Sequence, residues 1–263
     1  DQPPCLEAHL WIPFFIYFNV LNKSDFLEIK HFEEIFEDSK KYENYLRNSD
    51  IFINSSTPSF NLPIMNLALK YNTNYADLAS DIYKDEIIST LKFDQQILEN
   101  EFKSQNLFAL INLGVSPGIT NFLFFVKIHS LKNLPYEVKI KKLEINLLEE
   151  IQSKKLIFSW SPKVAIDELA FPPVFYKKNR PKTIEPFSKS KVYKFPYFRN
   201  LVDIYPVFQE ELISLKQSFP QIENLKLFVG GSEIELMKNL YQLNLFSNKY
   251  CYENSDSKIS INT

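Results

Sequence analysis

Three short apolar runs in the first half of the chain carry no regular alternation of polar residues. They are Asp50–Asn54, Asn74–Ala79 and Leu107–Leu113. Such runs are typical of parallel strands that are covered on both faces. Between them, apolar residues recur at helical spacing, once after Pro63 and again at Phe93, Ile97 and Phe102. The pattern therefore predicts a β-α-β-α-β order with a parallel sheet.

The pattern changes after a further predicted helix at Ile119–Ser130. Charged and apolar residues alternate in Tyr136–Leu148, which predicts an antiparallel strand with one wet face. Further strands are predicted at Leu156–Trp160, Asn200–Val207 and Leu225–Val229, and further helices at Ser161–Leu169, Gln209–Lys216 and Ser232–Leu245. We therefore expect an α/β protein with two domains: an incomplete, Rossmann-like parallel sheet in residues 1–130, and an α+β domain with a mostly antiparallel sheet in residues 131–263.

The first 48 residues are less regular. Trp11–Leu21 is predicted to be a buried strand, and Phe26–Asn48 a helix that leads into the strand at Asp50. The longest apolar run, Leu10–Leu21, is too short to span a bilayer. No basic segment precedes it, so we expect a cytoplasmic protein without a membrane partner.

Composition excludes several classes of function. The 263 residues are 45% apolar and 24% charged with a net charge of −2, so the chain has no general basic field for nucleic acid. Two cysteines imply no disulfide framework. The three histidines lack the spacing of metal ligands, and we expect no metal site.

Polar residues and glycines stand at the ends of the three predicted parallel strands. Asn54–Thr57 follow the first strand, Asp77 ends the second, and Gly114–Gly118 follow the third. In parallel sheets these ends meet at one edge, where ligands bind. We therefore expect Ser55, Asp77 and Ser116 to face a shared crevice. Each group also has a structural interpretation: a hydroxyl-rich turn, a helix cap, and a sharp strand-to-helix turn.

The segments SDIFINSSTP, TNYADLA and NLGVSPGITN carry a resemblance to a known family, together with IFSWSP and Leu225–Phe246 downstream. From Ser49 to Phe246 the chain resembles the saccharopine dehydrogenase-like oxidoreductases. The resemblance implies a homodimer that transfers a hydride between NAD or NADP and a C–N centre of a small molecule, an amino acid or polyamine-type substrate.

The resemblance also implies roles for individual residues. Asp77 would be catalytic, orienting the substrate or contacting the cofactor's sugar. Trp160 and Ser161 would bind substrate, with a core tryptophan as the structural alternative. Apart from the resemblance, Arg199 or Arg180 could bind a substrate carboxylate through both guanidinium nitrogens, with a surface arginine as the structural alternative. The cofactor would be bound by residues at two strand ends: Asn54, Ser55, Ser56, Thr57, Gly114, Ser116 and Gly118.

The chain departs from the family pattern in two ways. Its four glycines are Gly114, Gly118, Gly230 and Gly231, so it has no G-x-G-x-x-G turn for a pyrophosphate. The segments YPVFQEE and VGGSEIE lack the arginines of saccharopine reductases, which argues against saccharopine itself. Two alternatives follow: a degenerate member that acts as a structural or interaction protein, and a subunit that completes another chain's sheet.

Overall fold

The computed structural model describes residues 43–44, 46–80, 93–131, 138–151 and 161–245, and the strands at 252–254 and 257–259. The chain divides into two compact units, Asp1–Asp50 and Ile51–Thr263. In the first unit the described residues between 43 and 47 are helical, as the prediction for the end of Phe26–Asn48 requires. The strands predicted at Trp11–Leu21 and Leu156–Trp160 lie outside the described residues. The predicted boundary near residue 130 stays a prediction.

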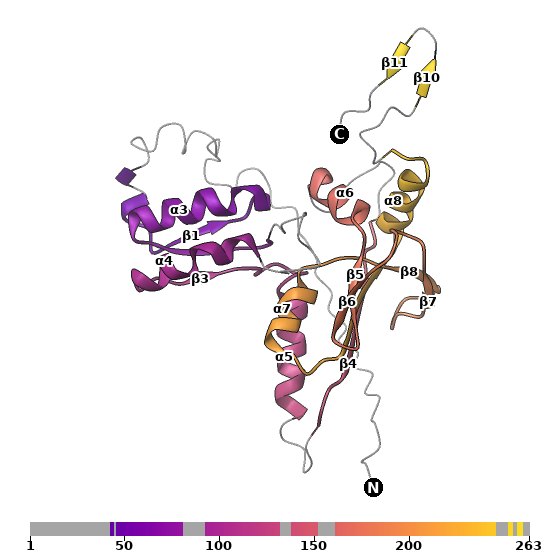
Figure 1. The fold of residues 1–263 in the computed structure, drawn as a ribbon, viewed down its shortest axis with the longest axis horizontal. Coiled ribbons are helices and arrows are strands. Elements are labelled where there is room, and N and C mark those ends of the chain that lie inside the picture. The colour runs from indigo at the N-terminus through magenta and orange to yellow at the C-terminus, as the bar shows by residue number, and fades with distance from the viewer. Residues whose placement is uncertain are drawn as a thin grey trace. The chain divides into compact units, whose positions relative to one another are not determined.

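The three predicted parallel strands form one sheet, drawn in purple and magenta in Figure 1. They are β1 (Ile51–Asn54), β2 (Asn74–Asp77) and β3 (Ala109–Leu110), in the order β1-β2-β3. Both pairings are parallel, and the register places Asn54 beside Asp77 at the strand ends. The α/β class and the parallel sheet are therefore confirmed.

One face of this sheet is covered by helical segments. After the short helix η2 (Pro58–Phe60), α3 (Asn61–Tyr71) buries Ile64, Met65 and Ala68 and ends at Asn72 in the left-handed conformation. The 3-10 helix η4 (Asp94–Leu98) and α4 (Glu99–Ser104) follow.

The stripe predicted for the second helical region is only partly correct. Phe93 and Phe102 are buried, but Ile97 is 62% exposed. Ile97 lies in the 3-10 helix, whose turn of three residues carries it out of a stripe spaced for an α-helix.

Among the described residues, the expectation that both faces of the parallel sheet are covered holds for one face and only in part for the other, where Ala76 of the central strand is 4% exposed. Tyr75 and Asp77 point to the covered face and are buried. On the opposite face, Ile53 is 63% exposed and Leu110 is 47% exposed. An apolar run indicates a strand without polar residues, but it does not indicate whether helices cover both faces of the sheet.

A second sheet of six strands contains the largest core. Its order is β6-β5-β9-β8-β7, with β4 on the other edge of β9. The strands are β4 (Lys142–Leu148), β5 (Val174–Lys177), β6 (Arg180–Thr183), β7 (Lys191–Tyr193), β8 (Val202–Pro206) and β9 (Asn224–Gly230). The sheet is mostly antiparallel, as predicted.

The direction predicted for β4 is wrong. The strand runs parallel to β9 over seven residue pairs, from Lys142 beside Asn224 to Leu148 beside Gly230. Alternation of polar and apolar residues indicates that one face of a strand is exposed to solvent, but it does not indicate the direction of the strand relative to its neighbours. A crossover of more than a dozen residues separates β4 from β9, which a parallel pairing needs.

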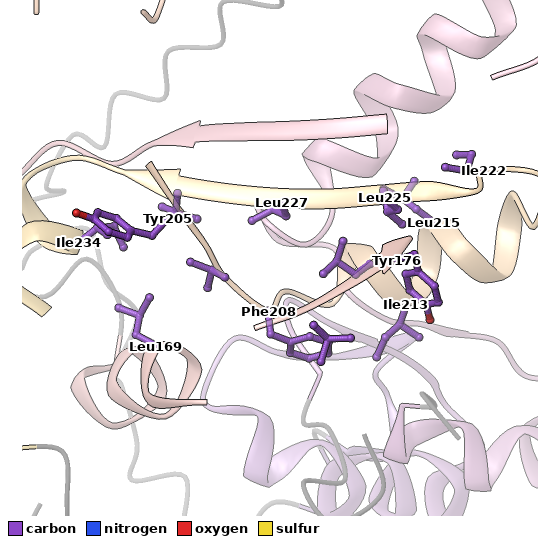
Figure 2. Packing of buried hydrophobic residues seen from close by; sticks show 14 of the residues in the cluster. Leu169, Tyr176, Tyr205, Phe208, Ile213, Leu215, Ile222, Leu225, Leu227 and Ile234 are labelled. Carbon is purple, nitrogen blue, oxygen red and sulfur yellow. The ribbon is translucent and has the colours of Figure 1, made fainter. Parts of the chain in front are cut away.

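Helices pack against this sheet: α6 (Pro162–Ala170), α7 (Glu211–Ser218) and α8 (Ser232–Gln242), with α5 (Ile119–Leu131) beside α7 (Figure 1). Figure 2 shows Leu225 and Leu227 of β9 among the side chains that these helices and loops contribute. Leu212, Ile222 and Leu225 have no exposed surface. Burying a leucine or isoleucine contributes about 1.5–3 kcal/mol, so this cluster is the main stabilising core.

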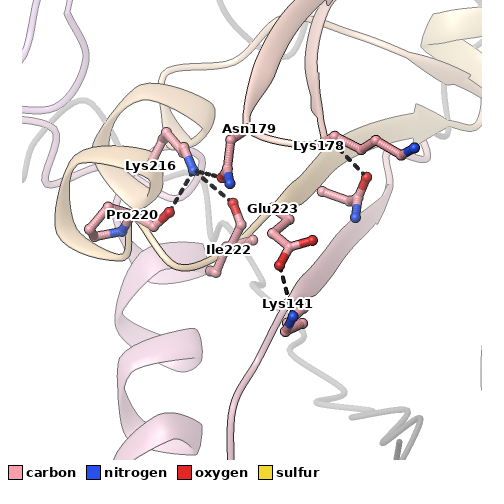
Figure 3. Close-up of polar contacts among 8 residues, drawn as sticks. Lys141, Lys178, Asn179, Lys216, Pro220, Ile222 and Glu223 are labelled. Carbon is pink, nitrogen blue, oxygen red and sulfur yellow. Dashed lines mark hydrogen bonds and ion pairs between the residues drawn. The ribbon is translucent and has the colours of Figure 1, made fainter.

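A lysine fastens the end of α7 to the surrounding loops (Figure 3). Lys216 Nζ donates to Asn179 Oδ1 at 2.6 Å and to the carbonyls of Pro220 and Ile222, both at 2.8 Å. Asn179 lies in the β5–β6 hairpin turn, where Lys178 and Asn179 both have positive φ, as a two-residue hairpin requires. Lys216 therefore joins α7, this hairpin and the segment that enters β9.

None of the helices in the described part of the chain has the length and apolar character needed to cross a bilayer.

Candidate functional site

The side chain of Asn54 organises the turn after β1. It is 2% exposed, and its Nδ2 donates to Asn61 Oδ1 at 2.6 Å. Its Oδ1 accepts from the Ser56 amide at 2.9 Å and from the Ser56 hydroxyl at 2.6 Å. The Tyr75 hydroxyl donates to the same Asn61 Oδ1 at 3.0 Å. The predicted cofactor residue Asn54 thus holds the strand end to the start of α3.

Asp77 is buried, 1% exposed, and both carboxylate oxygens are bonded inside the protein. Oδ1 accepts the backbone N–H of Asn112 at 2.7 Å, and Oδ2 accepts Gln95 Nε2 at 3.1 Å. Burial raises the pKa of this carboxyl, while the hydrogen bonds from Asn112 and Gln95 favour the charged form and oppose that rise. A carboxylate held in this way positions β2, η4 and the segment after β3; its catalytic role stays a prediction.

The same network extends through Ser80. Its hydroxyl accepts Gln95 Nε2 at 2.8 Å and donates to Asn112 Oδ1 at 2.7 Å. Gln95 Oε1 and Asn112 Nδ2 are buried and have no hydrogen-bond partner among the described residues. Asn54 and Asp77, adjacent in the sheet register, therefore lie in connected polar surroundings, as expected for converging strand ends.

The glycines after β3 are required by the packing of their own backbone. An added Cβ on Gly114 would lie 2.5 Å from the Leu78 carbonyl oxygen. Gly118 has a φ of 130°, and its Cβ would lie 2.2 Å from the Gly114 carbonyl oxygen. The turn closes through a bridge between these glycines, across the cis peptide bond Ser116–Pro117. Chain packing alone accounts for both glycines, and their predicted contact with a cofactor stays a prediction.

Ser116 faces a different partner from Asp77. Its hydroxyl donates to Glu211 Oε1, and the Thr120 hydroxyl donates to the same oxygen at 2.7 Å. The next residue, Asn121, donates from Nδ2 to Ser214 Oγ at 2.6 Å, and Ser214 lies three residues after Glu211 in α7. The start of α5 is therefore bonded to α7, and Ser116 belongs to this junction.

Ser55 is exposed, and its hydroxyl makes no hydrogen bond with a described residue. Ser56 is also exposed. Thr57 is partly buried, and its hydroxyl pairs with Ser59 Oγ at 2.9 Å. The structure brings Asn54 and Asp77 together, whereas Ser55 faces solvent and Ser116 faces Glu211.

Three glutamates that the sequence did not single out gather near this junction: Glu149 after β4, Glu211 at the start of α7, and Glu233 in the first turn of α8. We call them the three-glutamate cluster. Burial raises the pKa of Glu149 to about 7, with the charges of Glu233 and Glu211 as further causes. Burial also raises the pKa of Glu211, and the hydroxyls of Ser116 and Thr120 oppose that rise.

Two adjacent glycines set the position of Glu149. The Glu149 amide donates to the Gly230 carbonyl at 2.9 Å, which continues the β4–β9 ladder by one residue. A Cβ on Gly231, whose φ is 119°, would lie 2.0 Å from the Glu149 carbonyl oxygen. The Ile151 amide then donates to Ser232 Oγ at 2.9 Å. The lack of a side chain at Gly231 thus brings Glu149 against the start of α8.

Of the predicted substrate residues, Ser161 and Arg199 are described, and their role in binding substrate stays a prediction. Trp160 lies outside the described residues. Ser161 immediately precedes α6, and its side chain forms no capping bond. Arg199 is exposed, and its guanidinium has no hydrogen bond or ion pair with a described residue, while its carbonyl accepts from Lys194 Nζ. Within the described residues, no group of three His, Cys, Asp or Glu side chains is placed to hold a metal ion.

Comparison with solved structures finds one that has a similar fold. Apo histidine-tagged saccharopine dehydrogenase (L-Glu forming) from Saccharomyces cerevisiae superposes with a TM-score of 0.60 over 81% of this chain, at 15% identity. The two chains share a fold. The present chain spans about half of that enzyme, 48% of its length. The parallel sheet with its associated antiparallel sheet thus has a counterpart in a dehydrogenase.

Two further structures, both under oxidoreductase names, match less well. One from Bacteroides fragilis has a TM-score of 0.31 at 12% identity, covering 72% of this chain and 49% of its own. One from Bacillus subtilis has a TM-score of 0.32 at 7% identity, covering 77% and 54%. These scores are too low to support an argument. No protein-family model matches the chain, and no curated protein matches its sequence.

Proposed function

We propose that the chain is a saccharopine dehydrogenase-like oxidoreductase, acting with NAD or NADP at a C–N centre of an amino acid or polyamine-type substrate. The observation that supports this proposal is the fold shared with saccharopine dehydrogenase over 81% of the chain. The resemblance of the segments around β1, β2 and the Gly114–Gly118 turn agrees with it. The proposal includes the homodimer that the resemblance implies.

Polar groups at the end of β1 support the proposal for the cofactor. Ser55 and Ser56 present exposed hydroxyls at the end of β1, beside Asn54, where a sugar or amide group would find donors and acceptors. The chain has no glycine-rich turn of its own to surround a pyrophosphate. When bound, the nicotinamide would supply the hydride chemistry. The protein's part would be to hold that ring against the substrate carbon.

Titration of the chain with NADPH, followed by the fluorescence of the cofactor, tests the proposal. We expect saturable binding that Ser55→Glu weakens about ten-fold or more, because a carboxylate at the strand end would repel the diphosphate. The matched control is Asn66→Glu, which places the same charge on the exposed side of α3. Absence of saturable binding, or equal effects of both substitutions, would remove NADPH from this strand end.

A second candidate is a non-catalytic interaction protein with the same fold. Its supporting observation is an apolar face of α5, where Phe122 is 63% exposed, Phe125 57% and Val126 47%, at helical spacing. Sedimentation velocity with Phe122→Ser separates the two candidates. Loss of an oligomer together with absent NADPH binding would favour the interaction protein, whereas retained NADPH binding would favour the oxidoreductase.

A further inference from the structure

The loop that joins β7 to β8, residues 194–201, exposes apolar surface at one edge of the six-stranded sheet (Figure 1). We call it the β7–β8 loop. Tyr197 is 83% exposed and Leu201 is 68% exposed, the two largest exposed fractions among the large apolar residues of the described chain. The loop therefore presents two apolar side chains to solvent within four residues of each other.

The remainder of the loop packs against the sheet. Phe195 is 8% exposed and belongs to a small core cluster with Val202, and Phe198 packs against the same cluster. The rings of Tyr193 and Phe195 meet edge to face, with centroids 4.9 Å apart. The two phenylalanines hold the loop in place, while Tyr197 between them lies outside.

Tyr197 has a backbone conformation that is unfavourable for its residue type. Its φ is 62°, and the Phe198 amide donates to the Phe195 carbonyl at 3.4 Å across Pro196 and Tyr197. A proline followed by a left-handed residue is the arrangement of a type II turn, where glycine is usual at the second of these positions. A bulky side chain there strains the backbone, whereas glycine would not. Such strain is typical of functional sites, and here its result is an outward-facing tyrosine.

Positive charge surrounds the exposed apolar side chains. Residues 186–201 contain no acidic residue and four cations, in a chain of net charge −2: Lys189, Lys191, Lys194 and Arg199. Lys191 is paired with Glu144 of β4. Lys194 and Arg199 lie in the loop itself and are exposed, with the Lys194 ammonium bonded to the Arg199 carbonyl rather than to a carboxylate. The loop is therefore both apolar and cationic.

The acidic residues that flank this segment do not cancel its charge. Glu185 precedes β7, at the opposite end of that strand from the loop. Asp203 follows the loop in β8. The hydrogen bond with Tyr205 and, further, the charge of Asp203 raise the pKa of Lys238, so a lysine of α8 lies near the Asp203 carboxylate.

We propose that the β7–β8 loop binds the surface of an anionic lipid bilayer. Tyr197 and Leu201 would enter the interface between headgroups and acyl chains, and Lys194 and Arg199 would contact anionic headgroups. The sequence predicted no membrane partner because its longest apolar run is too short to span a bilayer. A loop that enters only the interface needs no spanning run.

The exposed leucine favours lipid over nucleic acid. Bases stack on aromatic rings and on guanidinium planes, so Tyr197 and Arg199 would also suit a single strand. Leu201 offers no such surface, and its side chain gains only by leaving water. A folded protein partner must match the loop within an interface of about 800 Å² on each side, whereas a fluid bilayer adapts to a narrow loop.

This inference goes beyond the proposed function and does not depend on it. It gives Arg199 a lipid headgroup as partner instead of a substrate carboxylate. Vesicle binding is measured without a cofactor, so its outcome is separate from that of the NADPH titration.

Flotation of the full chain with vesicles of phosphatidylcholine containing about 30% phosphatidylserine tests the proposal. We expect binding that is lost with phosphatidylcholine alone. Binding should also weaken about five-fold or more when the salt is raised from about 0.1 M to about 1 M, because the Debye length falls from about 10 Å to about 3 Å.

Two matched pairs of variants locate the contact. Leu201→Ser should weaken binding about five-fold or more, whereas Leu243→Ser, at a leucine 66% exposed at the end of α8, should change it less than about two-fold. Arg199→Gln should weaken binding about five-fold. Arg180→Gln, at an exposed arginine in β6 on the other edge of the sheet, should change it less than about two-fold.

Tyr197→Gly separates binding from folding. We expect vesicle binding about ten-fold weaker or more, with a free energy of unfolding in urea no lower than that of the wild type, because glycine relieves the strained backbone. A tyrosine with a purely structural role would give the reverse result, unchanged binding and lower stability.

Three results would overturn the proposal: no flotation with the anionic vesicles, equal losses within either matched pair, or unchanged binding by Tyr197→Gly. Binding of a single-stranded oligonucleotide or of polyglutamate in place of the vesicles would assign the loop to a nucleic acid or an acidic protein, and would also overturn it. Vesicle binding by a chain that does not bind NADPH would refute the proposed oxidoreductase and leave this inference standing.

Discussion

Replacing Glu149 with glutamine should stabilise the protein at alkaline pH and leave it almost unchanged at acidic pH. Burial and the neighbouring Glu233 and Glu211 raise the pKa of Glu149 from 4.5 to about 7. At about 1.4 kcal/mol for each pH unit, keeping this carboxyl ionised costs the folded state up to about 3 kcal/mol. Glutamine has a similar shape without the charge.

The sign follows from proton binding. Below about pH 4.5 the Glu149 carboxyl is protonated in both the folded and the unfolded chain, so the two proteins should have similar free energies of unfolding. Between about pH 4.5 and pH 7, Glu149 has already ionised in the unfolded chain, whereas in the folded chain it keeps its proton. The stability of the wild type therefore falls over this interval, and Glu149→Gln should not share that fall.

Urea denaturation at about pH 4.5 and about pH 8, followed by circular dichroism, gives the two free energies of unfolding for each protein. We expect the stabilisation by Glu149→Gln to be larger at the higher pH by roughly 2–3 kcal/mol. Glu150→Gln, at the exposed neighbouring residue, should give the same small difference at both values. A pH-independent effect of Glu149→Gln would refute the raised pKa.

Three further substitutions test other parts of the structure, each by urea denaturation at neutral pH. Lys216→Met should cost about 1–3 kcal/mol, because it removes three hydrogen bonds that join α7 to its loops, whereas Lys182→Met at an exposed position should cost less than about 0.5. Gly231→Ala should cost more than about 2 kcal/mol, since the new methyl meets the Glu149 carbonyl in a strained backbone; a neutral result would mean that this contact relaxes freely. Asn54→Ala should cost about 1–3 kcal/mol, because it removes the buried hydrogen bonds of Asn54 with Ser56 and Asn61, and Asn66→Ala on the exposed side of α3 is its control.

Periodicity was sufficient to predict the parallel strands and most helices. β1, β2 and α8 lie where the apolar patterns put them, with Ile234 and Met237 buried as the helical spacing required. The pattern of apolar and polar residues did not predict properties that depend on segments distant in the sequence. The direction of β4 depends on β9, about eighty residues further along the chain, and no local alternation encodes that partner.

The candidate site divides in the same way. Asn54 and Asp77 were found because each stands at a strand end, a position that local pattern reveals. The three-glutamate cluster was missed because Glu149, Glu211 and Glu233 come from three elements and resemble ordinary residues of solvated turns and helix starts. Only the pairing of β4 with β9 and the packing of α7 bring them together. The nearest local signal is the pair Gly230–Gly231, which marks a close approach of two backbone segments.

The central position of β9 has a consequence for synthesis of the chain. One edge of β9 pairs with β4, and the other pairs with both β5 and β8. The hairpins β5–β6 and β7–β8 are complete in themselves, but β4 has β9 as its partner in the sheet. During translation β4 through β8 are synthesised before β9. The pairings of β4, β5 and β8 with β9 can therefore form only after Gly230 has left the ribosome, so the complete sheet forms late.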